Sequence, residues 1–479
     1  MFFFDNFIIT QRTFYMISGF IILFLGTIIN FAISGLMGKN SQKFSNFTTI
    51  STLLISSISF LPFLCGFLSP HSSKAFYFFN QNIAFGGLEA FLCFIAQITV
   101  LFAFLISKKH LSKLRFKQHY FNSLYLCSAL SISMLIVSKG FIPFILSLET
   151  LSICSIFMLL GFKNRNVFYN AYKYLTMSFL ATLLMIFAYA ISSGFNVNTG
   201  VLAVSAKILF TIALLTKGGF AQVFAWNMQD KNEKNYPSFI FINTVAFFTY
   251  AIALHKMVHN VFETGSLAQI FFTLFFLTSC AISAFKITRV ENFKDFVYTL
   301  NTLNYCILGF LFFIQNTQIH TVALVLLINI LIVNFGLLSS GAILNINKNS
   351  NLDFKDFSGI SYSNPTYCKL LSIIIFIAVA AVPSGIFTAK FLTNIALAQT
   401  GLWSSIVMGL FAVIYTITIA SAINFIANFY KKPKTISELK TFKKRTNLNY
   451  SILFISIIIS LSLFVFNGYI TNVITSFLL

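Results

Sequence analysis

Charged residues are scarce in this chain. Of its 479 residues, 9% are Asp, Glu, Lys or Arg, and only 11 are acidic, whereas a soluble globular chain is about 25% charged. The hydrophobic share of 57% therefore excludes an ordinary soluble domain. A hydrocarbon core of about 30 Å needs about 20 apolar residues per helix. The sequence predicts an all-α polytopic membrane protein with about 14 transmembrane helices.

The predicted spans lie near 16–36, 47–68, 84–106, 119–138, 140–161, 170–192, 202–225, 238–258, 267–286, 297–315, 320–345, 368–395, 402–428 and 451–475.

Signatures of cofactor chemistry are also missing. The seven cysteines form no CxxC pair and fall mostly within predicted spans, which is typical of small apolar residues and not of disulfides or metal ligands. There is no GxGxxG or phosphate-binding loop. His255 and His259 are four residues apart but have no obvious acidic or thiol partner, and we expect them near the interface. No metal or redox cofactor is expected on this chain.

The net charge of +21 has an uneven distribution. Of the 32 Lys and Arg residues, 24 fall in the odd-numbered connections, including the runs in 108–117 and 431–445, while the even-numbered ones are nearly bare. This asymmetry is the positive-inside pattern. It predicts both termini on the outer, periplasmic face of the inner (plasma) membrane, and a bilayer as partner in place of nucleic acid. No cleavable signal peptide is evident around Asp5.

Four lysines interrupt the predicted spans: Lys173, Lys207, Lys217 and Lys390. A lysine at the centre of a transmembrane helix costs roughly 2.5–3.5 kcal/mol on insertion scales, so such residues are usually functional. Lys207 lies near an outer span end and is expected to anchor the interface, as is Glu89 at a helix start. The others are candidate proton carriers.

Glu149 lies mid-span in SLETLS, and Lys173 follows 24 residues later across a short loop. Antiparallel neighbours of this kind can bring the two charges together, and such a pair can switch proton occupancy. The alternatives are a protonated, hydrogen-bonded carboxyl for Glu149 and a side chain extended to the interface for Lys173.

Lys217 is followed directly by Gly218 and Gly219, with Gln222 and Trp226 continuing its face. Two glycines allow close packing or a local helix break that opens backbone groups to a cavity. The plainer alternative is a lysine paired with a backbone carbonyl.

Lys390 follows Pro383 and Gly385 in a span of unusual length, 368–395. Proline removes a backbone hydrogen bond and tends to kink or break a helix. Interrupted helices in two halves of a chain indicate a transport site.

These residues carry a family resemblance, over about 85–432. SLETLS with AYKYL, Lys217 nine residues before Trp226, the Asn292–Asp295 connection and Asn364-Pro365 ahead of Lys390 resemble the antiporter-like membrane subunits. Within that family the chain resembles subunit N of bacterial NADH–quinone oxidoreductase (complex I), the mitochondrial subunit 2 equivalent.

The resemblance implies two inverted five-helix repeats, each with a broken helix. Its divisions would be 1–115 for helices 1–3, 119–258 and 267–428 for the repeats, and 429–479 for a basic loop and helix 14. It implies proton transfer through Glu149, Lys173, Lys217 and Lys390, driven by quinone reduction in other membrane-arm subunits. NADH, FMN, iron–sulfur clusters and quinone would be handled by those partners, with no cofactor bound here.

The chain departs from the family pattern at several places. Gln222 and Phe224 replace an expected proline and histidine, Asn304 replaces a histidine, and Phe247–Phe248 occupy the position of a central lysine. Lys256 is the nearest lysine, and it, Gln222 and Asn304 are possible accessory residues. Two alternatives therefore stay open: a subunit of a multisubunit Na⁺/H⁺ antiporter, and a structural membrane-arm subunit that does not pump.

Overall fold

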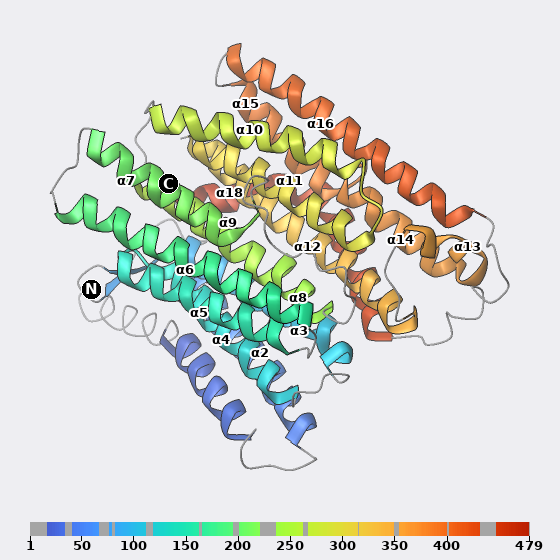
Figure 1. Ribbon diagram of the computed structural model, residues 1–479, viewed down its shortest axis with the longest axis horizontal. Coiled ribbons are helices and arrows are strands. Elements are labelled where there is room, and N and C mark those ends of the chain that lie inside the picture. Colours follow the sequence, from blue (N-terminus) through green and yellow to red (C-terminus); the bar gives the residue numbers. More distant parts are fainter. Residues whose placement is uncertain are drawn as a thin grey trace. The chain divides into compact units, whose positions relative to one another are not determined.

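The computed structural model describes residues 17–33, 41–66, 76–78, 82–111, 118–161, 165–194, 201–220, 236–261, 267–314, 316–348, 354–399, 402–431 and 447–478. Within them, eleven helices are long and apolar enough to cross a membrane, and Ile17–Ile33, Pro365–Ala378 and Gly385–Ala398 are shorter apolar helices. Each of the fourteen predicted ranges overlaps a helix. The chain is an all-α polytopic membrane protein, as predicted (Figure 1).

One small element was not predicted. Strands β1 (Phe76–Phe78) and β2 (Ile83–Phe85) form an antiparallel pair, and Ile83 also bridges to Ser138. The pair precedes α3 (Gly87–Leu111), so the helix predicted from residue 84 starts later. Three-residue strands carry too little pattern to be detected between apolar helices.

The chain forms two compact units. The first comprises Met1–Ser178, Thr244–Thr249 and Ser476–Leu479. Its helices are α2 (Ser41–Gly66), α3, α4 (Gln118–Val137), α5 (Phe141–Leu160) and the start of α6 (Arg165–Gly194). Helix α3 packs on α2 and α4, and Gln97 Nε2 donates to Ser133 Oγ at 2.7 Å. Hydrogen bonds between side chains are a common means of joining membrane helices.

The second unit comprises Phe179–Asn243 and Tyr250–Thr475. Its elements are the rest of α6, α7 (Val201–Gly218), α8 (Tyr236–Phe241), most of α9 (Phe247–Val261), α10 (Leu267–Ile287), α11 (Phe293–Phe313), α12 (Thr317–Lys348), η4 (Phe354–Phe357), α13 (Ile360–Ser363), α14 (Pro365–Ala378), α15 (Gly385–Ala398), α16 (Leu402–Ala427), η5 (Asn428–Tyr430) and most of α18 (Asn447–Leu478).

Helix α11 is the centre of this second unit. It packs against α10 and α12, and α12 in turn packs against α14 and α15 (Figure 1). Every residue in the membrane-spanning window of α11 is buried, against 22% for α16. Helix α11 is therefore enclosed by protein, while α16 presents most of its surface to lipid.

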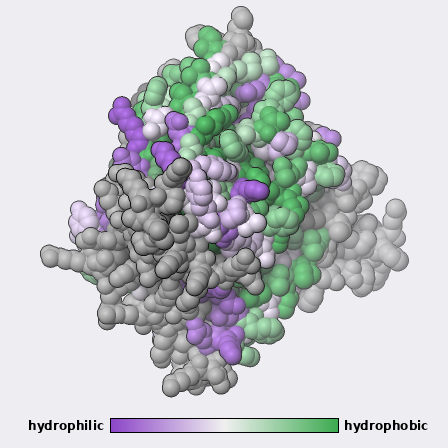
Figure 2. Space-filling model, turned by 90° about the vertical axis from the view of Figure 1, so that its right-hand side faces the viewer, coloured by the Kyte–Doolittle hydropathy of each residue, from purple (hydrophilic) through white to green (hydrophobic). Residues whose placement is uncertain are grey.

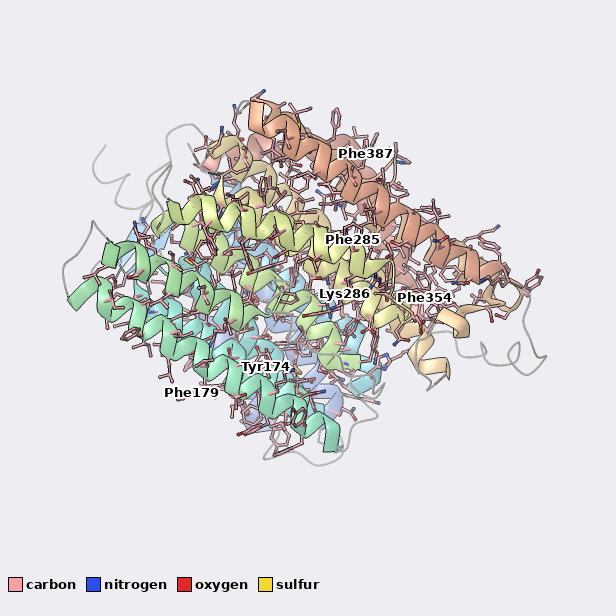
Figure 3. The ribbon with its side chains drawn as sticks, turned by 45° about the horizontal axis from the view of Figure 1, so that its top comes forward. Tyr174, Phe179, Phe285, Lys286, Phe354 and Phe387 are labelled. Atoms are coloured by element: carbon pink, nitrogen blue, oxygen red, sulfur yellow. The ribbon has the colours of Figure 1, made fainter. Side chains whose placement is uncertain are left out.

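Phenylalanine has a structural use in this unit. Phe354 of η4 stacks on Phe425 of α16 with ring centroids 3.9 Å apart, and Phe296 and Phe357 contact the same ring. Figure 3 labels Phe354 in this cluster. Aromatic pairs add about 0.5–1.5 kcal/mol beyond area burial, so the cluster fixes η4 against the ends of α11 and α16.

Apolar side chains also cover the outside. Phe179 on α6 and Phe285 on α10, both labelled in Figure 3, are 65% and 64% exposed. Figure 2 shows broad hydrophobic areas on the face that it presents. A soluble protein rarely exposes such contiguous patches, so these surfaces are suited to lipid or to partner helices.

A glycine on α12 gives a test of this packing. A Cβ on Gly341 would collide with the Tyr236 hydroxyl and the Phe293 ring, and that hydroxyl donates to Leu338 O at 2.7 Å. Because overpacking of a tight contact costs about 1–3 kcal/mol, we expect Gly341→Ala to lower the thermal midpoint of the purified protein. Gly409→Ala is the control: its Cβ would meet nothing within 4 Å. Equal midpoints for the two variants would contradict this packing.

Candidate functional site

Lys217 is completely buried in the last turn of α7. Its Nζ donates a hydrogen bond to Thr182 Oγ1 on α6 at 2.8 Å, and both residues belong to the second unit. The last turn of a helix carries a partial negative charge that attracts a cation. The ammonium is thus held by a hydroxyl and by the end of its own helix.

Helix α7 stops one residue after this lysine. Gly219 has φ = 65°, a left-handed conformation that suits glycine, and its carbonyl accepts a hydrogen bond from Tyr298 Oη on α11 at 2.8 Å. The ring of Phe220 packs against Tyr250, Tyr298 and Tyr305. The pair Gly218–Gly219 therefore ends α7 where the sequence suggested a break, and the last part of the predicted span, 221–225, lies outside the described residues.

The Thr182 contact leads to a prediction about Lys217. Thr182→Val keeps the shape of the side chain but removes the acceptor, and we expect it to lower the thermal midpoint of the purified protein, since a hydrogen bond to a charged group contributes about 1.5–3 kcal/mol. Thr182→Ser retains the hydroxyl and should stay near the wild-type midpoint. Equal midpoints in the Val and Ser variants would show that the contact does not stabilise the buried lysine.

The eighth predicted span contains a π-helical segment, Ile242–Ala246, directly before the buried Phe247 and Phe248. Such segments inside α-helices occur frequently at functional sites. Asn243 within it accepts from Asn301 Nδ2 through Oδ1 at 2.9 Å and from Asn334 Nδ2 through its carbonyl at 3.2 Å. Asn243 thus joins buried asparagines of α11 and α12, and it comes shortly before Phe247 in the sequence.

Asn304 of α11, one turn from Asn301, is also buried. The Oδ1 atoms of Asn301 and Asn304 have no hydrogen-bond partner within the described part of the chain. Buried polar atoms without a protein partner are usual positions for ordered water. Asn304 was predicted as a possible accessory residue, but Asn243, Asn301 and Asn334 were not, although polar residues inside apolar spans were visible in the sequence and would have indicated them.

The second lysine follows a break in the twelfth predicted span. Helix α14 ends at Ala378 and α15 begins at Gly385, so the range 368–395 is two helices and not one. Ala380 between them has φ = 66°, Pro383 follows a cis peptide bond, and Ser384 Oγ caps α15 by accepting from Phe387 N at 3.2 Å. At the start of α15, Asn467 Nδ2 of α18 donates to the Gly385 carbonyl at 2.7 Å.

Lys390 lies in the second turn of α15 and is 3% exposed. Its Nζ has no hydrogen-bond partner among the described residues and lies 4.3 Å from the centroid of the Tyr415 ring on α16. A cation within about 6 Å of an aromatic face is attracted by the ring quadrupole. Thr182 and Tyr415, the neighbours of the two lysines, could not be identified from sequence.

Glu149 on α5 and Lys173 on α6 are both half-buried and belong to the first unit. Glu149 has an interaction within the described part of the chain. The pairing of its carboxyl with the Lys173 ammonium stays a prediction.

The remaining predicted residues have different surroundings. Lys207 and Lys256 are half-buried, and Gln222 and Trp226 lie outside the described residues. His255 is buried, with its ring 4.9 Å from Phe312 and 5.6 Å from His320. It lies two turns before the end of α9, in a part of the helix that is enclosed by protein, and its position at the membrane interface stays a prediction.

No protein-family description and no curated protein sequence matches the chain. Solved structures do. A chain of respiratory complex I from Thermus thermophilus, with bound aureothin, is 15% identical with a TM-score of 0.74, over 95% of this chain and 98% of that one.

Two further solved structures match over a similar share of the chain. A chain of the Mrp complex from a Dietzia species is 11% identical with a TM-score of 0.79, over 96% of each chain. A chain of the membrane-bound sulfane sulfur reductase, an archaeal respiratory membrane complex, is 12% identical with a TM-score of 0.78, over 97% of this chain and 96% of that one. At these identities the chain shares the fold of these membrane-complex chains.

Proposed function

We propose that the chain is a proton-translocating, antiporter-like subunit in the membrane arm of an NADH–quinone oxidoreductase, and that subunit N is the nearest equivalent. The observation that carries the proposal is the position of two buried lysines beside helix breaks. Lys217 precedes the end of α7 at Gly218, and Lys390 follows the start of α15 at Gly385. Amines of this kind, excluded from water, are suited to accept and release protons.

In the second unit, packed helices with buried polar groups connect the elements of the two lysines. The end of α7 is bonded to α11 through Tyr298, α11 carries Asn301 and Asn304, and α11 packs on α12, which packs on α15. Water at the unpaired asparagine oxygens would add further proton carriers along α11. Glu149 and Lys173 in the first unit are proposed to influence the proton occupancy of Lys217 by their charge.

The proposed surroundings follow from the same comparisons and from the charge pattern. Other membrane-arm subunits are the partners, and quinone reduction in them supplies the energy, so this chain contributes no redox centre. The basic connections face the cytoplasm and both termini face the periplasm.

A second candidate function is supported by a different observation. The chain matches the Mrp complex chain with a TM-score of 0.79, beside 0.74 for the complex I chain. The same buried lysines would serve a subunit of a multisubunit Na⁺/H⁺ antiporter. A third candidate, a subunit that assembles without pumping, is motivated by Phe247 and Phe248 at the position of the central lysine.

Inverted membrane vesicles separate these candidates. We expect acidification of the vesicle interior to start on addition of NADH and to stop with a quinone-site inhibitor, in proportion to the amount of this chain. Acidification that requires a Na⁺ gradient and ignores NADH would favour the antiporter. NADH oxidation that proceeds with the same proton yield when the chain's lysines are removed would favour the structural subunit.

A further inference from the structure

The described helices that pack against α15 carry no carboxylate. Helix α12 has no acidic residue, and none of the eleven acidic residues falls between 357 and 437, so α14, α15 and α16 have none either. Lys390 Nζ and Tyr415 Oη are both buried without a hydrogen-bond partner in the described residues. The centroid of the Tyr415 ring lies 4.3 Å from Nζ.

The two buried lysines differ in this respect. Lys217 is bonded to a hydroxyl and lies at the carbonyl end of its helix. Lys390 lies near the amide end of α15, where the helix dipole repels a cation. A lysine that must carry a proton at this position needs another source of attraction, and an aromatic face supplies one without adding a competing proton acceptor.

We propose that Tyr415 is the positioning residue for the Lys390 ammonium, with its ring face acting in place of a carboxylate counter-ion. The inference rests on the proposed function, since it concerns the protonated state of a lysine on the transfer route. Neighbouring rings hold the Tyr415 ring in position. It stacks on Phe411, one turn earlier on α16, with centroids 6.0 Å apart, and Phe411 packs on Phe310 of α11 at 5.3 Å.

The proposal can be tested by lowering the electron density of the ring at position 415 while its shape is kept nearly constant. Phenylalanine, 4-fluoro-, 3,5-difluoro- and 3,4,5-trifluorophenylalanine are incorporated at position 415 of the full chain in its complex, and NADH-driven proton uptake is measured in inverted vesicles at equal complex content. Each fluorine withdraws charge from the ring face. We expect Tyr415→Phe near wild type and a stepwise decline, reaching about tenfold for the trifluoro ring.

Phe425 is the control, because it is a buried ring on the same helix that stacks on Phe354 of η4. The same fluorinated residues at 425 should leave uptake unchanged. A flat series at 415, or equal declines at 425 and 415, would overturn the inference.

Lys390→Met separates this inference from the proposed function. If Lys390→Met abolishes uptake while the fluorine series at 415 is flat, only the role of Tyr415 is wrong. If Lys390→Met pumps at the wild-type rate, the proposed route through this lysine fails, and the inference fails with it.

Discussion

Replacing Lys217 by alanine is expected to lower NADH-driven proton uptake by about a hundredfold, since a positioned proton-transfer group contributes roughly 10²–10⁴-fold. Lys217 is completely buried beside the end of α7, where no other described amine occupies the same turn. Water could fill the space left by the side chain but would not hold a proton there. Uptake is measured in inverted vesicles, normalised to the assembled complex.

Lys207→Ala is the control for this variant. Lys207 is on the same helix, ten residues earlier, and is half-buried. Its removal changes the charge of α7 by the same amount but leaves the break at Gly218 untouched, so uptake should remain near wild type. Equal losses in the two variants would indicate a general effect of charge on α7 or on assembly, and would contradict a specific role for Lys217.

Replacing Lys390 by alanine is the second variant with a large expected effect, again about a hundredfold in proton uptake. The side chain is 3% exposed, its Nζ has no hydrogen-bond partner among the described residues, and the Tyr415 ring lies against it. Removing an unpaired buried ammonium also removes a desolvation cost. We therefore expect the variant to be at least as stable as the wild type while losing transfer, a combination that a structural residue would not show.

Lys369→Ala is its control, because Lys369 lies on α14 before the break and is exposed. Thermal midpoints of the two variants are compared together with uptake. A lowered midpoint for Lys390→Ala, with uptake reduced only in proportion to the folded protein, would make Lys390 a packing residue.

The membrane helices and the helix breaks were predictable for clear physical reasons. Apolar runs of about 20 residues have few alternatives to a span. Gly218, Gly219, Pro383 and Gly385 gave the positions where α7 stops and where α15 is separated from α14. Hydropathy, a glycine pair and a proline are local signals. They can be interpreted without knowing which helices are neighbours.

The partners of the candidate residues were not predictable, because they depend on which helices pack together. Thr182 is 35 residues from Lys217 and Tyr415 is 25 residues from Lys390, in different helices. The π-helical segment at Ile242–Ala246 has no sequence signature of its own. The pairing of Glu149 with Lys173 across a short loop is of the same kind, since it depends on how α5 and α6 are rotated, and it stays a prediction.

The most direct test of a proton route through this chain is the double variant Lys217→Ala with Lys390→Ala. Two groups on one route act in series, so their losses should not add. We predict that the double variant takes up protons at the rate of the less active single variant and no more slowly, when NADH drives uptake and the content of assembled complex is equal. Wild-type uptake by the double variant would show that protons do not pass through these lysines, and would leave the chain a structural part of its complex.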